Sequence, residues 1–364
     1  MAVPISDQVI VITGASSGIG LATAREAARR GARVVLAARN VPALERIAEE
    51  IREAGGTAIA VGTDVTDYDQ VVALARRAVE EYGRIDTWVN NAAVSLYATF
   101  RDISLEDFRR VLDVNLMGQI HGAKAALPYL EESAGALICI GSVESARGVP
   151  MQSAYAASKH ALDGWADALR AELAKERSPV RVTMIKPAAI NTPIFEHAKS
   201  QLGVTPKAFP PVYAPELVVD AILHAAENHD REIYVGTAAR ILAWMDRINP
   251  RLGDALFRLA GYRFQVTDHP KSPDEGHNLY APLPGGSVRG TTARWELKLS
   301  LYPWVQEHDA AVPLAAAAAM ALGALALRRA SSGSAVAAGI LGAGALILAA
   351  NGTLAAARIG EPGA

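Results

Sequence analysis

Seven short apolar runs, most of them rich in β-branched residues, alternate with helix-like stretches between residues 9 and 236 of this 364-residue chain. A run that is apolar on both faces is typical of a strand in a parallel sheet covered on both sides. Parallel strands need crossover connections, which are usually helices. The alternation therefore predicts an α/β fold, a doubly wound Rossmann-type sheet of about seven parallel strands with helices on both faces. The runs occupy residues 9–13, 33–38, 57–62, 85–90, 136–141, 180–185 and 232–236.

The charge balance and the cysteine content limit the kinds of partner and compartment. Lys and Arg number 36 against 38 Asp and Glu, for a net charge of −2. No block of like charges stands out, which argues against a nucleic-acid partner because that binding needs a basic surface. Cys139 is the single cysteine and lies in an apolar run, so we expect a buried, unreactive thiol and no internal disulfide framework.

A glycine-rich turn follows the first predicted strand. The segment TGASSGIG (residues 13–20) places Gly14, Gly18 and Gly20 between that strand and a helix. Glycines let the backbone turn tightly and approach a pyrophosphate, which the free N–H groups at the start of the helix then bind. The strand–turn–helix context makes this a specific signal for a dinucleotide, with Ser16, Ser17 and Ile19 as further contacts.

The end of the second predicted strand indicates which dinucleotide binds. Proteins that hold an unmodified ribose usually place an acidic residue about 20 positions after the glycines. This chain has Ala38 and then Arg39. A neutral side chain leaves room for a 2′-phosphate, and a guanidinium can bind it in a bidentate manner. NADP(H) is therefore predicted in preference to NAD(H), and the alternative is that Arg39 is a surface residue opening a loop.

Tyr155 and Lys159 are four residues apart in a long helical pattern and therefore project from the same face. The reference pKa of tyrosine is about 10, so a phenol alone is a poor proton shuttle near neutral pH. A neighbouring ammonium stabilises the phenolate, and we expect Lys159 to lower the pKa of Tyr155 in this way. Ser142, at the carboxyl end of its strand, is placed to donate to a carbonyl oxygen on which negative charge develops.

Together these motifs resemble those of the short-chain dehydrogenase/reductase family, over residues 8 to about 236, in the branch with TGxxxGxG and YxxxK spacing. The segment KPAAINTP (186–193) also matches, although the family more often has Pro-Gly where this chain has Pro187-Ala188, so the local turn is expected to differ. The resemblance implies a catalytic set of Asn115, Ser142, Tyr155 and Lys159. It implies cofactor contacts from Gly14, Ser16, Ser17, Gly18, Ile19, Gly20, Arg39, Asp64, Val65, Asn91, Ala92, Tyr155, Lys159, Pro187, Ile190 and Thr192.

Individual roles follow from the same resemblance. Asp64 and Val65 are expected to contact the adenine, and Thr192 the carboxamide of the nicotinamide. Lys159 is expected to hydrogen-bond the nicotinamide ribose. Asn115 is expected to hold a helix distortion and a water that links Lys159 to solvent. No metal site is implied.

The chain divides into four predicted parts. Two short amphipathic helical patterns, with Asn249 as N-cap and Pro250 first in the second helix, precede a segment rich in Pro and Gly. The His and acidic residues of that segment match no spacing of metal ligands. The parts are 1–237 (an NADP-binding catalytic domain), 238–266 (an amphipathic helical extension), 267–309 (a linker) and 310–364 (an apolar, alanine-rich helical tail).

The tail contains two uncharged stretches, 310–327 and 335–357. At about 1.5 Å per residue the second is long enough to cross a bilayer core of about 30 Å, so membrane contact through 310–357 is expected. The alternative is an alanine-rich hairpin packed on its own protein. The N-terminus lacks the features of a signal peptide, which predicts a cytoplasmic catalytic domain anchored by the tail.

The sequence thus predicts an NADP(H)-dependent oxidoreductase that transfers a hydride between nicotinamide and a carbonyl or secondary alcohol. Residues 142–151 and 189–215 are expected to line the substrate site, with Glu144, Arg147 and His197 as polar candidates among apolar residues, so a lipophilic ketone or aldehyde is favoured. A homodimer or tetramer is implied by resemblance. The alternatives are a non-catalytic NADP(H) sensor and a membrane-tethered scaffold with the same fold.

Overall fold

The computed structural model describes residues 3–293 and 295–299, and contacts group Met1–Leu299 into one compact unit. The apolar stretches at 310–327 and 335–357, and with them the predicted membrane contact, lie outside the described residues. Within the described ranges, no helix combines the length and hydropathy that crossing a membrane requires.

A seven-stranded parallel sheet forms the centre of the described unit, which confirms the predicted fold class. The strand order is β12-β7-β6-β4-β1-β2-β3, so the chain winds outward from β1 in both directions. Doubly wound sheets of this kind bind ligands beyond the carboxyl ends of their strands. The strands are β1 (Val9–Thr13), β2 (Arg33–Ala38), β3 (Thr57–Gly62), β4 (Thr87–Asn90), β6 (Ala136–Ile140), β7 (Arg181–Pro187) and β12 (Glu232–Val235).

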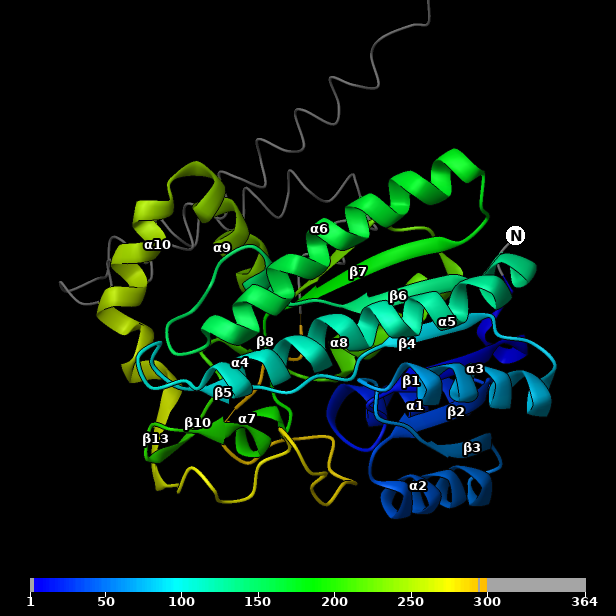
Figure 1. The fold of residues 1–364 in the computed structure, drawn as a ribbon, viewed down its shortest axis with the longest axis horizontal. Coiled ribbons are helices and arrows are strands. Elements are labelled where there is room, and N and C mark those ends of the chain that lie inside the picture. Colours follow the sequence, from blue (N-terminus) through cyan, green and yellow to red (C-terminus); the bar gives the residue numbers. More distant parts are fainter. Residues whose placement is uncertain (1–2, 294, 300–364) are drawn as a thin grey trace, which may run out of the picture. The chain divides into compact units, whose positions relative to one another are not determined.

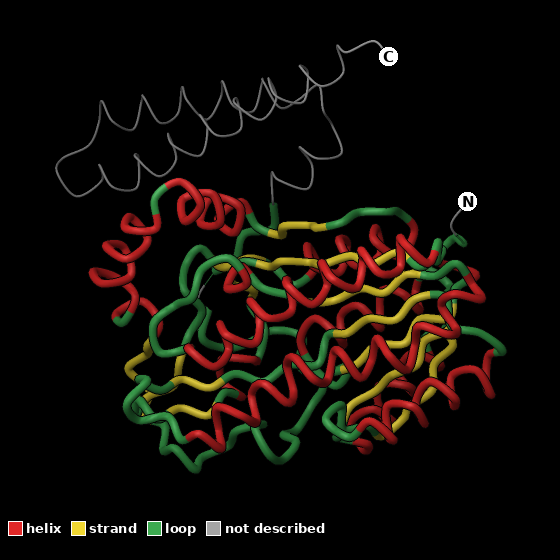
Figure 2. Tube along the Cα trace, turned by 45° about the horizontal axis from the view of Figure 1, so that its top comes forward, coloured by secondary structure: helices red, strands yellow, loops and turns green. Residues whose placement is uncertain are grey.

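Helices cover both faces of the sheet (Figures 1 and 2). One layer contains α1 (Gly18–Arg29), α2 (Val41–Glu53) and α8 (Glu216–Glu227). The opposite layer contains α3 (Tyr68–Tyr82), α4 (Leu105–Leu112), α5 (Gly118–Ser133) and α6 (Ser153–Glu176). Strand β1 shows why both are needed, since Ile10 and Ile12 pack into the first layer while Val9 and Val11 pack into the second. Burial of each such side chain contributes about 1.5–3 kcal/mol.

Local signals set the ends of several helices. The side chain of Asn40 caps α2 by accepting from the Ala43 amide at 3.0 Å. Asp67 caps α3 in the same way, and Gly83 ends that helix in the left-handed conformation, with φ +79°. These caps satisfy backbone groups that a helix end leaves without intrahelical partners. They also fix where each strand-to-helix loop begins.

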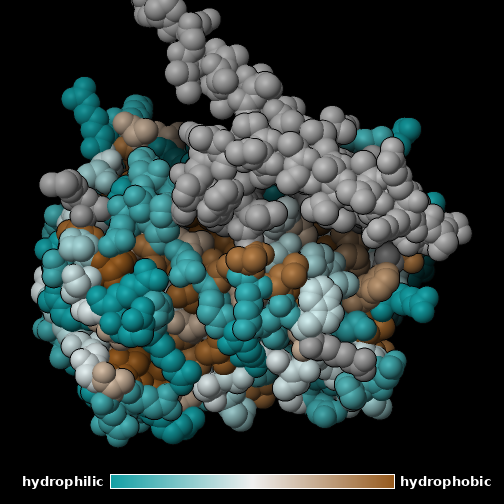
Figure 3. All heavy atoms as spheres, turned by 180° about the vertical axis from the view of Figure 1, so that it is seen from behind, coloured by the Kyte–Doolittle hydropathy of each residue, from teal (hydrophilic) through white to brown (hydrophobic). Residues whose placement is uncertain are grey.

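The outer surface of the α1, α2 and α8 layer is polar. Arg25 pairs with Glu50 at 2.7 Å, and Arg30 pairs with Glu26 and Asp220. The side of the molecule seen in Figure 3 accordingly shows hydrophilic residues interspersed with smaller hydrophobic areas. Exposed pairs of this kind contribute little to stability, about 0–1 kcal/mol each, so this face is best understood as a solvated one.

Short elements gather beyond the carboxyl ends of the strands (Figure 1). Two parallel pairs, β5 with β9 and β8 with β11, and one antiparallel pair, β10 with β13, build this region. Because β5 follows β4 and β8 follows β7, these pairs extend the sheet edge where ligands are expected. The elements are β5 (Leu96–Tyr97), β8 (Ala189–Ile190), α7 (Ile194–His197), β9 (Lys199–Ser200), β10 (Val204–Pro206), β11 (Val212–Tyr213) and β13 (Val266–Pro270).

Two helices follow the last strand of the sheet, α9 (Thr237–Ile248) and α10 (Pro250–Leu256). Asn249 caps α10 by accepting from the Arg251 amide at 3.1 Å, and Pro250 is the first helical residue, as the sequence predicts. Residues 271–293 then return to the main unit, and their contacts are described below. The domain boundary placed after residue 237 and the linker placed at 267–309 stay predictions.

Candidate active site

The glycine turn at residues 13–20 requires glycine at three positions. Gly14 and Gly18 have φ +69° and +57°, a conformation that other residues rarely adopt. A Cβ atom on Gly20 would lie 2.4 Å from the Gly14 carbonyl oxygen and 2.5 Å from Nδ2 of Asn91. A turn without these Cβ atoms allows a pyrophosphate to approach its backbone closely.

Asn91 and Ala92 join this turn to the end of β4. The amides of both residues donate to Oγ1 of Thr13, at 3.0 and 3.1 Å. Nδ2 of Asn91 donates to the carbonyl oxygens of Thr13 and Gly14, at 2.9 and 3.3 Å. These hydrogen bonds join the residues after β4 to the end of β1 and to the glycine turn.

Helix α1 begins directly at the turn. Ser17 is its N-cap residue and has extended backbone, but its side chain makes no capping hydrogen bond. The amide of Gly18 donates to the carbonyl oxygen of Ser287, at 2.9 Å. Ile19 packs against the core, and Gly18 lies close to Thr192, whose Cβ is 3.4 Å from where a Gly18 Cβ would be. The positive end of the helix dipole thus faces the carboxyl edge of the sheet.

Arg39, Asp64 and an unpredicted residue, Arg110, converge at the ends of β2 and β3. Asp64 accepts from Oγ1 of Thr66 at 2.8 Å and from Nη2 of Arg110 at 3.2 Å, and these donors keep its pKa low. Burial and the charge of Arg110 lower the pKa of Arg39. No motif marks Arg110, which reaches the site from α4, so only the structure identifies it. Val65, next to Asp64, is buried.

Ser142 and Tyr155 meet beyond the end of β6. Ser142 is buried and caps the turn Val143–Ser145, its Oγ accepting from the Glu144 amide at 3.1 Å. Tyr155 lies in the first turn of α6 and is partly exposed. A hydrogen bond from Ser142 acts to lower the pKa of the phenol. The hydroxyl group of Ser142 and the phenol of Tyr155 are therefore within reach of one reacting oxygen.

The predicted lowering of the Tyr155 pKa by Lys159 is wrong for this structure. Its Nζ is 5.5 Å from the centroid of the Tyr155 ring and donates to the Ile140 carbonyl oxygen at 2.7 Å. Burial lowers the pKa of Lys159 to about 8. The pKa of Tyr155 is raised rather than lowered, because burial and the charge of Glu144 outweigh the hydrogen bond from Ser142. Desolvation disfavours the phenolate, and the loss of water around a side chain cannot be read from the spacing of residues.

Asn115 lies in a distorted helical turn. Residues Asp113–Met117 form a π-helix between α4 and α5, at the position where the resemblance implies a helix distortion. Asn115 is fully buried; its Oδ1 accepts from the Val94 amide at 2.8 Å, and its Nδ2 donates to the Val94 carbonyl oxygen and to Oγ of Ser158. Ser158 directly precedes Lys159, so Asn115 fixes the turn of α6 that carries the lysine.

The segment after β7 brings Pro187, Ile190 and Thr192 to the same edge. Pro187 and Ile190 are buried, as is Thr192 at 6% exposure. Ala188 donates to the Val235 carbonyl oxygen at 2.8 Å. The non-glycine residues with positive φ in the described ranges are Ala134, Met151 and Arg177, so Ala188 is accommodated without that conformation. Ala188, in place of the glycine more usual in the family, therefore causes no backbone strain at this turn.

Glu144 is a buried carboxyl group inside the site. It is 6% exposed, and its Oε2 has no hydrogen-bond partner among the described residues. Burial raises the pKa of Glu144 to about 8, against a hydrogen bond from the Val149 amide and the charge of Lys159. A carboxyl group in this position is neutral or charged near physiological pH according to small changes in its surroundings.

Other candidates lie in different surroundings. Arg147 points to α9 and α10, where it pairs with Asp246 at 2.7 Å and with Asp254. The ring of Phe209 packs on Phe257 and Phe264, with centroids 5.7 and 6.0 Å away. These contacts place neither Arg147 nor Phe209 next to Tyr155.

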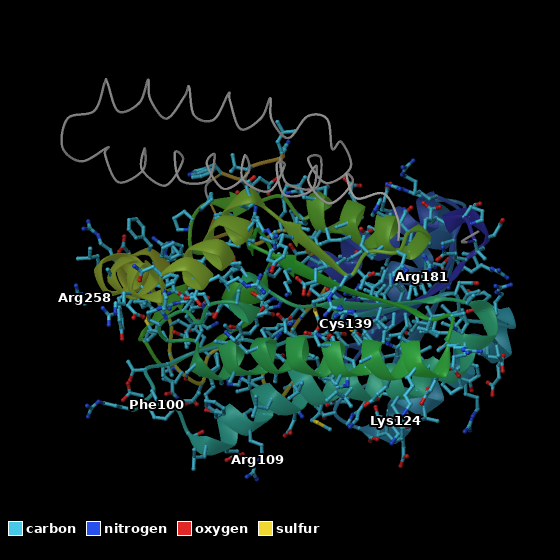
Figure 4. The ribbon with its side chains drawn as sticks, turned by 90° about the horizontal axis from the view of Figure 1, so that it is seen from above. Phe100, Arg109, Lys124, Cys139, Arg181 and Arg258 are labelled. Atoms are coloured by element: carbon cyan, nitrogen blue, oxygen red, sulfur yellow. The ribbon has the colours of Figure 1, made fainter. Side chains whose placement is uncertain are left out.

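The cysteine and the acidic residues suggest no further chemistry. Cys139 is fully buried on β6, in the interior of the view in Figure 4, and burial raises its pKa to about 11. By contrast, Arg109 and Lys124 are exposed on α4 and α5. In residues 3–293 and 295–299 there is no group of three or more His, Cys, Asp or Glu side chains able to hold a metal ion.

Comparisons with known proteins agree with this geometry. The family model described as short chain dehydrogenase matches residues 8–203. The uncharacterized oxidoreductase YxnA of Bacillus subtilis is 44% identical over 301 residues, which cover 82% of this chain and 85% of that protein.

Two solved structures have the same fold. An alcohol dehydrogenase from Thermococcus sibiricus, complexed with 5-hydroxy-NADP, has a TM-score of 0.54 and 28% identity and covers 62% of this chain and 95% of its own. A short-chain type dehydrogenase/reductase from Mycobacterium marinum has a TM-score of 0.56 and 30% identity and covers 64% of this chain and 95% of its own.

Proposed function

The chain belongs to the short-chain dehydrogenase family, and we propose that it is an NADP(H)-dependent oxidoreductase acting on a carbonyl compound or a secondary alcohol. The observation that carries the proposal is the meeting of Ser142 and Tyr155 at the carboxyl end of β6, one helical turn from Lys159. Reduction of a carbonyl needs a proton on oxygen as well as a hydride on carbon, and these residues supply the oxygen side.

The residues at the sheet edge fit a nicotinamide dinucleotide phosphate. The cradle formed by Gly14 and Gly20 has no room for a Cβ atom at Gly20, and the N-terminus of α1 lies beside it, where the Gly18 amide donates to the Ser287 carbonyl oxygen. Ala38 ends β2 without a negative charge, and Arg39 follows it. The T. sibiricus enzyme, complexed with 5-hydroxy-NADP, supports this choice by analogy. When bound, the cofactor supplies or accepts the hydride.

Tyr155 is the proposed general acid and base. In reduction its hydroxyl group donates a proton to the substrate oxygen, and in oxidation the phenolate takes one back. Oγ of Ser142 accepts from the Glu144 amide, and its single hydrogen, which acts on the Tyr155 phenol in this structure, would turn to the substrate oxygen when a substrate binds. Lys159 places a positive charge near the phenol, and Asn115 holds the turn of α6 that positions the lysine.

The neighbourhood of Tyr155 favours an apolar substrate. Tyr97, Met151 and Ala198 form a small buried cluster, against which Phe195 and Leu202 pack. Tyr97 is close enough to Tyr155 and Glu144 for their charges to raise its pKa. We therefore propose a lipophilic ketone, aldehyde or secondary alcohol.

The test is NADPH consumption by the full-length protein in detergent, against a panel of apolar and polar ketones and aldehydes, with NADH in parallel. Turnover is expected with NADPH on apolar carbonyls, and Tyr155→Phe should abolish it while Tyr262→Phe, a change at an exposed tyrosine, leaves it intact. Tight NADPH binding with no turnover on any compound would favour a sensor. Activity confined to small hydrophilic carbonyls would contradict the lipophilic substrate.

Membrane contact through residues 310–357 rests on the sequence alone. We propose that this contact locates the enzyme at a membrane. A chain ending at Leu299, the end of the first compact unit, tests this proposal. Retained turnover together with loss from the membrane fraction is expected. Unchanged fractionation would refute the anchor without touching the catalytic proposal.

A further inference from the structure

Residues 271–293, which we call the strap, form a loop beyond the carboxyl ends of the strands (yellow and orange in Figure 1). One residue of α7, Glu196, holds both ends of this loop. Near the start of the strap, Nζ of Lys271 donates to the carbonyl oxygens of Glu196 and Ala198. Near its end, the amides of Thr291 and Thr292 donate to the Glu196 carboxylate.

The first part of the strap lies on Arg39. Nη2 of Arg39 donates to the carbonyl oxygen of Asn278, and Nη1 donates to that of Tyr280 at 2.8 Å. The next residue of the β2–α2 loop, Asn40, donates to the Leu283 carbonyl oxygen at 2.8 Å. The guanidinium predicted to hold a 2′-phosphate is therefore oriented by backbone oxygens from the other end of the catalytic unit.

Arg110 is held by the residue between these two contacts. Its Nε donates to the carbonyl oxygen of Leu279 at 3.0 Å, while its Nη atoms contact Thr66 and Asp64. The side chain of Leu279 is fully buried in the core cluster that also contains Val65. The hydroxyl group of Tyr280 donates to Asp107 at 2.9 Å. Leu279 and Tyr280 thus anchor this part of the strap from two sides.

The later part of the strap lies on the glycine turn. The amide of Gly286 donates to the Ser16 carbonyl oxygen at 2.8 Å, and the Ser287 carbonyl oxygen accepts from the Gly18 amide. Gly285 approaches the turn so closely that its Cβ would lie 2.6 Å from the oxygen of Ser16. The strap consequently touches the loops after β1 and β2, and it reaches the loop after β3 through the Arg110 side chain. All three loops border the adenosine half of a dinucleotide site.

The chemistry of these contacts preserves the positive charge of the cluster. Carbonyl oxygens are neutral acceptors, so they orient Arg39 and Arg110 without cancelling their charges. Asp64 offsets one of the two, and the cluster keeps a net positive charge. A guanidinium has five N–H donors, of which the strap uses a part. Partial exclusion of water strengthens the attraction of such a cluster for a phosphate.

We propose that the strap is a specificity element for the cofactor: through the carbonyl groups of residues 278–280 it turns Arg39 and Arg110 toward the 2′-phosphate and so selects NADP(H) over NAD(H). Leu279 and Tyr280 are positioning residues that act through Arg110 and Arg39. The inference rests on the proposed function and deepens it.

The test compares the Kd of NADPH with that of NADH, measured by nucleotide fluorescence without substrate. Leu279→Ser removes the buried anchor and is expected to raise the Kd of NADPH by about tenfold, with the Kd of NADH changed by less than about twofold. Leu279→Met, which keeps an apolar side chain, should retain the preference of the wild type for NADPH over NADH. Leu259→Ser, the same change at an exposed leucine, is the matched control.

A background that lacks both guanidinium groups separates positioning from general loosening. In a chain that carries Arg39→Gln and Arg110→Gln, Leu279→Ser is expected to have little further effect on NADPH, because it acts through these two guanidinium groups. Tyr280→Phe, which removes one hydroxyl group, gives a milder version of the same loss of preference if Leu279→Ser does not fold. Full additivity of Leu279→Ser with the Arg39→Gln and Arg110→Gln pair would overturn the proposal.

Two further outcomes would also overturn it. Tighter NADPH binding in the strap variants would mean that the strap competes with the phosphates for their donors, and equal weakening of both cofactors would mean a clamp without specificity. Failure of the proposed function looks different, because the wild-type protein would then show no preference for NADPH, or no turnover that depends on Tyr155, before any strap variant is compared.

Discussion

Nζ of Lys159 lies 5.5 Å from the centroid of the Tyr155 ring and donates its hydrogen bond to the carbonyl oxygen of Ile140. The lysine therefore contributes a nearby positive charge and no direct hydrogen bond to the ring. That carbonyl oxygen also accepts from Nε2 of Gln119, at 3.0 Å. The carbonyl oxygen of Ile140 therefore keeps a hydrogen-bond donor when Lys159 is replaced.

Lys159→Met is expected to lower turnover by about a hundredfold or more while the fold is kept. Since the pKa of Lys159 is lowered to about 8 from 10.5, the folded protein binds fewer protons than the unfolded chain between these values. The wild type should therefore gain stability relative to Lys159→Met as pH rises through that window. Thermal unfolding of both proteins from pH 7 to 10.5 checks this. A constant difference would contradict it.

Glu144→Gln is expected to shift the pH profile of alcohol oxidation. The negative charge of Glu144 raises the pKa of Tyr155, so its removal should lower that pKa and move the acid limb of kcat/KM to lower pH, by about one unit. The measurement is the pH dependence of kcat/KM for any secondary alcohol that the enzyme accepts. Glu172→Gln, at an exposed position of α6, is the control. An unshifted profile would show that the Glu144 carboxyl group stays neutral over the whole pH range of the measurement.

Arg39→Asp is expected to reverse the cofactor preference. A carboxylate repels a 2′-phosphate and accepts a hydrogen bond from a free 2′-hydroxyl group, so the Kd of NADPH should rise by about a hundredfold and that of NADH should fall. Isothermal titration with both nucleotides measures it. Arg76→Asp, on the exposed side of α3, controls for the change in net charge. Unchanged NADPH affinity would place the phosphate elsewhere.

Gly20→Ala is expected to destabilise the protein and weaken cofactor binding, because its Cβ would lie 2.4 Å from the Gly14 carbonyl oxygen. Forced shifts of this kind cost about 1–3 kcal/mol. Gly164→Ala, in the middle of α6 with no atom within 4 Å of its Cβ, should instead stabilise by about 0.5–1 kcal/mol. Chemical denaturation of both variants compares them. An equal change in the free energy of unfolding of the two variants would mean that the glycine turn relaxes around the added Cβ atom.

The sheet and the order of its strands along the chain could be predicted from the amino-acid sequence alone. The apolar runs predict strands because burial on two faces forces every residue of a run such as Val9–Thr13 to avoid water. Spacing also determined that Tyr155 and Lys159 share one face of a helix. Both are local properties, fixed by residues a few positions apart.

The electrostatics of the site and the contacts of the segment after residue 270 depend on the tertiary structure. Arg39 and Tyr280 are separated by 241 positions, and their contact uses a backbone oxygen that every residue carries, so no pattern of side chains announces it. The pKa of Glu144 and of Tyr155 depends on how much water each loses, which is set by the packing of distant elements. Periodicity records which face of an element is buried, whereas desolvation and long-range backbone contacts exist only once the chain has folded.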